Sequence, residues 1–192
     1  MQIEVQVEVN VQDYYFDQAE GRDDRSPIPT ETWEIWFQRW LEYLQPELSL
    51  SQAYELSLRL TDDAEIQALN AQYRHKNQPT DVLAFAALEV NYPQLEEMQA
   101  ILPLSLGDIV ISVETAQNQA IQQEHSLQHE LAWLAAHALL HLLGWDHPDE
   151  MSLIRMVKQQ DCLLQAIGLN IGDYAAENST EQKDLDTEAS KL

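Results

Sequence analysis

The stretch His137-Ala-Leu-Leu-His141-Leu-Leu-Gly144-Trp-Asp-His147 holds three of the six histidines of the chain and predicts its central helix. Its first seven residues belong to a run over residues 127–143 that is rich in Leu and Ala and has no proline or glycine. We therefore expect a helix up to Gly144. His137 and His141 would then share one face, about 40° apart around the helix and ~6 Å apart along it.

Gly144 favours a turn that brings the third histidine back to the first two. A helix commonly ends in a left-handed glycine, and Pro148 soon afterwards discourages its continuation. Three neutral imidazoles around an open fourth position are the coordination of a hydrolytic zinc site, in which a bound water ionises near pH ~7. His137, His141 and His147 are therefore predicted to bind one metal ion, with zinc as the expected ion.

Two other interpretations of these histidines explain the pattern less well. A single histidine is more often an ordinary hydrogen-bonded side chain, but a pair four residues apart with a third after a glycine is hard to explain by packing alone. A structural zinc site usually closes with four Cys or His ligands, and the one cysteine, Cys162, is distant in sequence from His147. Asp146 is the remaining candidate for a fourth ligand.

Length and composition predict one globular domain. The 192 residues are 45% hydrophobic, enough for a sizeable core. We expect a single domain over residues 1–175, in which residues 13–50 form a longer N-terminal insertion and helix, followed by a disordered acidic tail over residues 176–192. The sequence shows no run of ~18 apolar residues and no signal-peptide pattern, and one cysteine forms no internal disulfide. We therefore expect a cytoplasmic protein with no membrane partner.

The formal net charge of −23 argues at first sight against a nucleic-acid partner, because phosphate binding normally uses a basic surface. The distribution of charge matters more than the total. Acidic residues gather near the two ends of the chain, which we interpret as peripheral, whereas Arg74 and Lys76 lie in its motif-rich middle. RNA binding therefore stays open, while DNA is not expected as a partner.

Alternating apolar and polar residues predict strands, and apolar stripes at helical spacing predict helices. Strands are expected over residues 2–12, 54–60, 81–87 and 106–112, helices over residues 31–45, 62–74, 113–123, 127–143 and 148–166, and a loop over residues 88–105. Thr30 is expected to cap the first helix and Pro148 to open the last. The aromatic stripe of the first helix is expected to pack in the core rather than to stack on bases.

These elements predict an α/β (α+β) fold class. We expect a single domain in which a central, mostly four-stranded sheet packs with helices as a two-layer or three-layer sandwich. The metal-binding histidine helix is expected to be buried against this sheet, because it is the most apolar helix of the chain.

Three segments of the chain occur in an order that one known family shares. They are Asn70-Ala-Gln-Tyr-Arg74-His-Lys76-Asn-Gln-Pro-Thr80-Asp81-Val-Leu-Ala-Phe85, Leu106-Gly107-Asp108-Ile-Val-Ile111 and His137-x3-His141-x2-Gly144-x-Asp146-His147. Together they resemble the YbeY family of metal-dependent endoribonucleases, over roughly residues 55–168. The resemblance implies a cytosolic bacterial enzyme that cuts single-stranded RNA, matures the 3′ end of small-subunit (16S) ribosomal RNA and acts in ribosome quality control. It also implies one bound metal, usually zinc, held by the three histidines.

Two positions depart from the family pattern. Ala138 stands where the family commonly has glycine, and Ala84 where it commonly has serine. Both replacements are small, so close packing at the site is expected to survive, whereas a hydroxyl contact at position 84 is lost.

RNA cleavage builds negative charge on phosphate oxygens, which requires a metal to activate water and a cation to hold the anion. Arg74 is the candidate cation because its planar guanidinium matches two phosphate oxygens, and Lys76 adds a point charge. Arg74 and His137 are the residues expected to act in catalysis, in which a metal-activated water attacks the phosphodiester. Asp81 and Asp108 stay open as carboxylates that orient the ligands or pair with Arg74, or as turn caps.

Two other functions stay open at this point. The histidine spacing is also that of a zinc endopeptidase, but such enzymes place Glu directly after the first histidine, where this chain has Ala138. Glu130 lies two helical turns earlier, ~10 Å along the axis, which is too far for it to serve a metal-bound water. Glu130 and Asp146 remain candidate hydrogen-bond partners for the N–H group of a histidine ring. The second alternative is a non-catalytic, ribosome-associated binding factor whose metal stabilises the fold. A ribosomal protein is the expected partner that compensates for the acidic surface.

Overall fold

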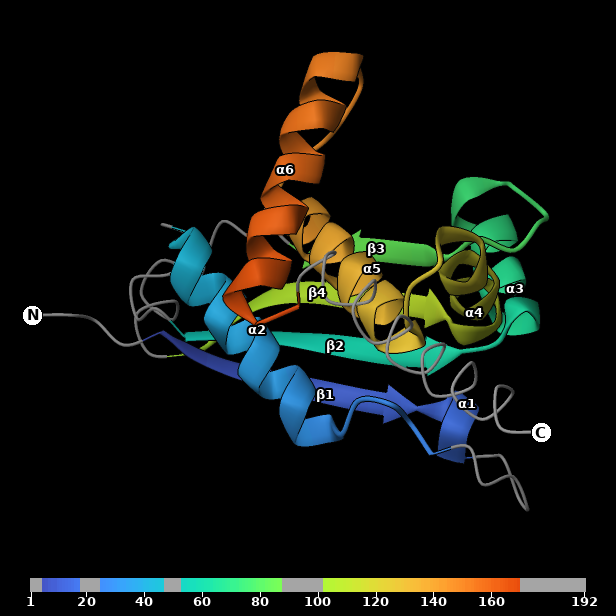
Figure 1. Ribbon diagram of the computed structural model, residues 1–192, viewed down its shortest axis with the longest axis horizontal. Coiled ribbons are helices and arrows are strands. Elements are labelled where there is room, and N and C mark those ends of the chain that lie inside the picture. Colours follow the sequence, from blue (N-terminus) through green and yellow to red (C-terminus); the bar gives the residue numbers. More distant parts are fainter. Residues whose placement is uncertain (1–4, 18–24, 47–52, 88–101, 170–192) are drawn as a thin grey trace, which may run out of the picture.

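The computed structural model describes residues 5–17, 25–46, 53–87 and 102–169 (Figure 1). The expected tail over residues 176–192 and most of the expected loop over residues 88–105 lie outside the described residues. The elements in chain order are β1 (Gln6–Asp13), α1 (Tyr14–Asp17), α2 (Thr30–Leu44), β2 (Ala53–Thr61), α3 (Asp63–Arg74), β3 (Val82–Ala86), β4 (Leu104–Ser112), α4 (Val113–Gln123), α5 (Leu127–Leu142) and α6 (Glu150–Ala166).

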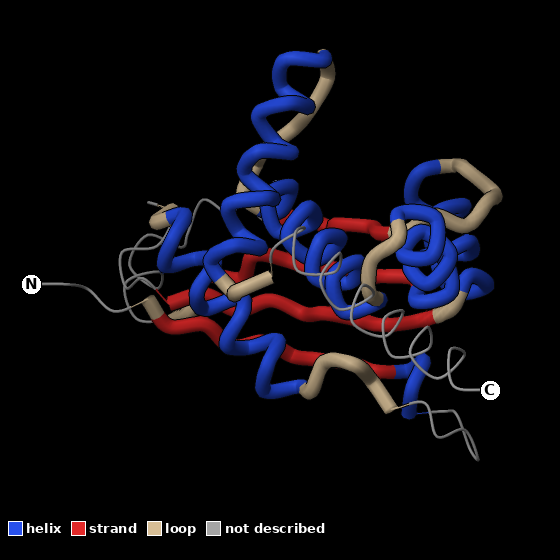
Figure 2. Tube along the Cα trace, in the orientation of Figure 1, coloured by secondary structure: helices blue, strands red, loops and turns tan. Residues whose placement is uncertain are grey.

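The four strands form one mixed sheet in the order β1-β2-β4-β3, drawn in red in Figure 2. β1, β2 and β4 run parallel, and β3 pairs antiparallel with β4 at one edge of the sheet. Side chains alternate between the two faces along each strand, and Leu56, Leu58, Ile109 and Ile111 are buried on the same face in the main core. The predicted α/β fold with a four-stranded sheet is confirmed.

Helix α5 is the centre of the helical layer on this core face. It packs against β3 and β4, α4 lies beside it, and α6 packs on both α5 and α2 (Figure 1). Apolar residues occur around its whole circumference, and a helix of this kind must be buried. The predicted burial of the histidine helix against the sheet is therefore confirmed. Neither α5 nor any other helix in the described ranges is long and apolar enough to cross a membrane.

The aromatic stripe of α2 packs in the core, as predicted. Trp33, Phe37 and Trp40 are completely buried. The Phe37 and Trp40 rings meet edge to face with their centroids 5.1 Å apart, a favourable aromatic geometry. Trp40 also donates a hydrogen bond from Nε1 to the carbonyl oxygen of Leu163 at 2.8 Å, which fixes α6 against α2.

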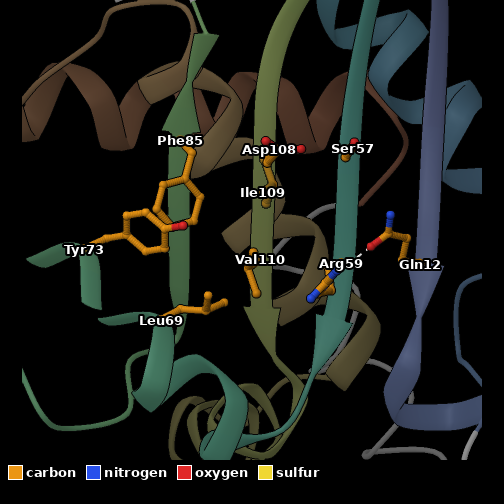
Figure 3. Close-up of a pocket in the computed structure, with 9 residues that line it drawn as sticks. All are labelled: Gln12, Ser57, Arg59, Leu69, Tyr73, Phe85, Asp108, Ile109 and Val110. Carbon is orange, nitrogen blue, oxygen red and sulfur yellow. Dashed lines mark hydrogen bonds between the residues drawn. The ribbon is translucent and has the colours of Figure 1, made fainter. Parts of the chain in front are cut away.

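Helix α3 packs on the opposite face of the sheet from α5. Its Ile66 is buried against Leu83 of β3 and Val110 of β4. Beyond α3 this face of the sheet has a cavity of about 430 Å³, with Arg59 and Asp108 among its lining residues (Figure 3). The sheet separates this cavity from α5.

Gly107 allows the edge strand β3 to approach β4 closely. Its φ of +124° lies in a region that side-chain-bearing residues rarely adopt. A Cβ atom at this position would lie only 2.0 Å from the carbonyl oxygen of Phe85 and 2.9 Å from the backbone nitrogen of Ala87. Only glycine fits without a shift of the β3 backbone.

Two predicted helix starts are wrong. Pro29 is the N-cap of α2 and Thr30 already belongs to the helix, so Thr30 provides no side-chain cap. α6 starts at Glu150 rather than at Pro148, because Asp149 is its N-cap. The side chains of Asp149 and Ser152 form a capping box that satisfies the first N–H groups of α6.

Candidate metal centre

The turn after α5 carries the third histidine back toward the helix. Gly144 has a φ of +90°, which glycine adopts without steric penalty, so the predicted glycine turn is present. The backbone N–H of Trp145 donates to the carbonyl oxygen of Leu140 at 2.9 Å and closes the helix end. The backbone N–H of His147 then donates to the side chain of Asp146 at 2.8 Å.

His137, His141 and His147 converge at the C-terminal end of α5. Their ligand nitrogen atoms all lie within 4.8 Å of one another, and all three side chains are half-buried. The Nε2 atoms of His137 and His141 are 3.1 Å apart. The centroid of the His147 ring lies 5.5 Å from that of His137 and 5.3 Å from that of His141. The structure thus brings together the three histidines that the sequence singles out.

The chemistry of these donors fits a divalent metal ion. Burial lowers the pKa of His137, and burial together with the neighbouring imidazoles lowers the pKa of His141. Both rings are therefore neutral at neutral pH and have lone pairs to offer. Two nitrogens at about 2.0–2.1 Å from one zinc ion lie ~3.3 Å apart in a tetrahedral arrangement, close to the observed Nε2 separation. Within the described ranges no carboxylate or thiol joins this group of three histidines.

Gln160 of α6 also contacts the cluster, and sequence reasoning missed it. Its Oε1 atom lies 3.1 Å from Nδ1 of His137, and its side chain is only 1% exposed. The signal in the sequence was a polar residue on the buried stripe of α6, beside Met156 and Leu163. A polar residue at such a position normally has a specific hydrogen-bond partner.

Arg74 is not part of the histidine cluster. It is the last residue of α3, which packs on the face of the sheet opposite to α5, and its side chain is exposed. Among the described residues it forms neither a hydrogen bond nor an ion pair, so no pairing with Asp81 or Asp108 is found there. Lys76 is exposed in the loop that follows. The role of Arg74 in binding phosphate stays a prediction.

Within the described residues, Asp81, Asp108 and Glu130 form no hydrogen bond with a ring of the histidine cluster. Asp81 accepts a hydrogen bond from Nε2 of Gln119 at 3.0 Å and fixes the loop before β3. Asp108 is exposed and lines the cavity on the face of the sheet that α3 packs on (Figure 3). Glu130 lies 3.0 Å from Nε2 of His125 and therefore holds that ring rather than one of the cluster.

A mixed α/β domain in which two histidines of the buried central helix converge with a third from the following loop has the framework of a hydrolase with a candidate metal site. The chain belongs to the endoribonuclease YbeY family, because the family model described as Endoribonuclease YbeY matches residues 18–168. This confirms the family that the sequence motifs indicate.

Relatives of known name agree with this assignment. The protein named Endoribonuclease YbeY from Nostoc sp. is 63% identical over 173 residues, which are 87% of this chain and 93% of that protein. The protein of the same name from Synechocystis sp. is 49% identical, over 86% of this chain and 93% of that protein. The solution structure of TM1509 from Thermotoga maritima is similar with a TM-score of 0.50 and 20% identity, covering 83% of this chain and 89% of that one, and supports the fold alone. Since the relatives are named as RNA endonucleases, the predicted enzyme class is confirmed.

Proposed function

We propose that the chain is a metal-dependent endoribonuclease that cleaves single-stranded RNA in the cytoplasm. The observation that carries this proposal is the convergence of His137, His141 and His147 in a member of the endoribonuclease YbeY family. We further assign it to maturation of the 3′ end of 16S ribosomal RNA and to ribosome quality control, which the family resemblance implies. The ribosome or a ribosomal protein is then its partner.

The three histidines would hold one metal ion, with zinc as the expected ion. When bound, such an ion supplies a Lewis acid for a phosphate oxygen and lowers the pKa of a water molecule. The chain contributes neutral ring nitrogens, because burial lowers the pKa values of His137 and His141 and a protonated imidazole has no free lone pair. It also contributes an open fourth position, which lets the phosphate of the RNA approach.

Arg74 is the residue proposed to hold the RNA phosphate. β3 is an edge strand, with α5 packed on one face and α3 on the other. We propose that an RNA strand crosses this edge and contacts both the exposed guanidinium of Arg74 and the histidine cluster. The guanidinium can donate to two phosphate oxygens at once, and Lys76 follows two residues later in the chain.

The peptidase alternative lacks a general base in the position where it is needed. Ala138 follows His137 directly, and the carboxylate of Glu130 lies 3.0 Å from His125. The binding-factor alternative would keep the metal but would not need Arg74, so the same measurements test it.

The test of the substrate is cleavage of a single-stranded RNA that carries the 3′ end of 16S ribosomal RNA, compared with the same RNA annealed to a complementary strand. The zinc-loaded protein should cleave the single strand and leave the duplex intact. A His137→Ala preparation made in parallel controls for contaminating nucleases. If the parent protein binds zinc and cleaves neither RNA, the binding-factor function replaces this proposal.

A further inference from the structure

Gln160 is the side chain of α6 that reaches the histidine cluster. It is 1% exposed, so both ends of its amide need hydrogen-bond partners inside the protein. Its Oε1 atom lies 3.1 Å from Nδ1 of His137, and its Nε2 atom donates to the carbonyl oxygen of Trp133 at 3.4 Å. The amide thus bridges two positions one turn apart on α5.

The contact with Trp133 fixes which end of the amide faces His137. A carbonyl oxygen only accepts hydrogen bonds, so the NH2 end of Gln160 must face Trp133. The reversed amide would set two acceptor oxygens against each other. The oxygen of Gln160 therefore faces Nδ1 of His137, and because this oxygen can only accept, Nδ1 must carry the proton.

A neutral imidazole has one protonated nitrogen and one free lone pair. With the proton on Nδ1, the lone pair of His137 is on Nε2, the atom that lies 3.1 Å from Nε2 of His141. We propose that Gln160 is a positioning residue that holds His137 in its Nδ1–H tautomer and thereby keeps Nε2 free for the metal. This inference rests on the metal site of the proposed function and adds the residue that orients one of its ligands.

Helix α6, which carries Gln160, is held in place near both of its ends. At the start, the capping box of Asp149 and Ser152 holds the helix directly after the loop that carries His147. One turn beyond Gln160, the carbonyl oxygen of Leu163 accepts the hydrogen bond from Trp40 at 2.8 Å. A rigidly held hydrogen-bond partner can impose one tautomer and one orientation on a histidine ring. Residues that hydrogen-bond metal ligands commonly act in this way.

His141 is oriented differently, since its ring hydrogen-bonds the backbone at Trp145. A backbone partner cannot be removed by replacing a side chain. Gln160 is therefore a position at which a single substitution outside the ligands can change the orientation of a ligand.

The experiment compares Gln160→Leu, Gln160→Glu and the control Gln159→Leu, whose residue is the neighbour of Gln160 on the same helix. Zinc affinity is measured by competition with a chromophoric chelator, and the tautomer of His137 is measured by nitrogen NMR of the metal-free protein. Gln160→Leu should bind zinc about tenfold more weakly and lose the pure Nδ1–H tautomer. Gln160→Glu should keep the Nδ1–H tautomer because a carboxylate oxygen also accepts from Nδ1, although the donor to Trp133 is lost. Gln159→Leu should bind like the parent.

Two results overturn the inference. One is a folded Gln160→Leu protein that binds zinc as tightly as Gln159→Leu. The other is a metal-free parent protein in which His137 carries its proton on Nε2, and this measurement decides even if Gln160→Leu fails to fold. Neither readout uses RNA, so a failure of the proposed nuclease activity would leave both interpretable.

Discussion

The Nε2 atoms of His137 and His141 lie 3.1 Å apart on successive turns of α5. Two neutral imidazole nitrogens at this distance need either one shared proton or one cation between them. The ring of His147, from the loop beyond Gly144, also has a nitrogen within 4.8 Å of these two atoms. A cation can therefore bind all three nitrogens, whereas a shared proton bridges only two.

Replacement of a single ligand should therefore be costly for metal binding. His141→Ala is expected to weaken zinc binding by about 100-fold or more, because two nitrogens from His137 and His147 hold zinc poorly. The exposed His75 provides a matched control, and His75→Ala should bind zinc like the parent. Zinc titration of both variants gives the comparison; equal affinities would place the metal elsewhere.

Arg74→Ala should reduce the kcat/KM for cleavage of single-stranded RNA by about 10- to 100-fold, since one preorganised charge on the phosphate is lost. Zinc content and melting temperature should be unchanged, because the side chain is exposed and lies on the face opposite to α5. Arg74→Lys should recover part of the loss through charge alone. Arg39→Ala removes an equally exposed arginine from α2 and should have little effect. If both alanine variants lose activity equally, the effect comes from net charge and not from Arg74.

Glu130 should make the free energy of unfolding depend on pH. Burial, together with the negative charge of Asp81, raises the pKa of this carboxyl group from 4.5 to about 7. Between these values the native state binds more protons than the unfolded state, so stability falls as the pH rises from 4.5 to about 7. The expected loss is on the order of 1–3 kcal/mol.

The surroundings of Glu130 explain how a raised pKa coexists with a nearby histidine. Nδ1 of His125 faces the carbonyl oxygen of Ser126 at 3.2 Å and therefore carries a proton. Nε2 of the same ring lies 3.0 Å from the Glu130 carboxyl group, and a single proton between these two atoms forms their hydrogen bond. His129 and Asp81 are the other titratable groups nearby.

Denaturant unfolding from pH 4.5 to pH 8 checks this pH dependence. Glu130→Gln should lose this fall and leave the opposite contribution of His129, His137 and His141, whose lowered pKa values make stability rise with pH, whereas the exposed control Glu55→Gln should keep the parent profile. Identical pH profiles for the parent and Glu130→Gln would show that Glu130 is not the group responsible.

Gly107→Ala should destabilise the fold by ~3 kcal/mol or more, because the added Cβ meets the Phe85 carbonyl oxygen at 2.0 Å in addition to the strain of a positive φ. Gly168→Ala is the matched control. Gly168 also has a positive φ, but nothing lies within 4 Å of its added Cβ, so only the conformational strain of ~1 kcal/mol remains. Thermal unfolding of both variants should rank them in this order, and an equal loss would contradict the close approach of β3 to β4.

Local patterns in the sequence predict the elements that carry the histidines. Asp62 and Ser112 accept backbone N–H groups of the first turns of α3 and α4, so these helices start where their cap residues indicate. The Leu- and Ala-rich run predicts α5 and Gly144 its end, and the helical period alone puts His137 and His141 on one face. All of these interactions act within a few residues of the chain.

Contacts between distant segments could not be predicted in the same way. Periodicity shows that a helix has an apolar face, but not which face of the sheet it covers, so the packing of α3 opposite to α5 was not expected. The antiparallel pairing of β3 with β4 and the contact of Gln160 with His137 likewise depend on how whole elements pack. Arg74 and Asp108 belong to motifs that the family resemblance groups with the histidines, yet the sheet lies between Asp108 and α5.

The most direct test of the account is metal analysis of the purified protein, coupled to cleavage of single-stranded RNA before and after chelation. The native protein should contain about one metal ion per chain, lose cleavage when the ion is removed and regain it when zinc is restored. The double variant His137→Ala/His141→Ala should contain no stoichiometric metal and should not respond to zinc. Cleavage that is unaffected by complete removal of the metal, or unchanged metal content in the double variant, would contradict a metal-dependent endoribonuclease built on His137, His141 and His147.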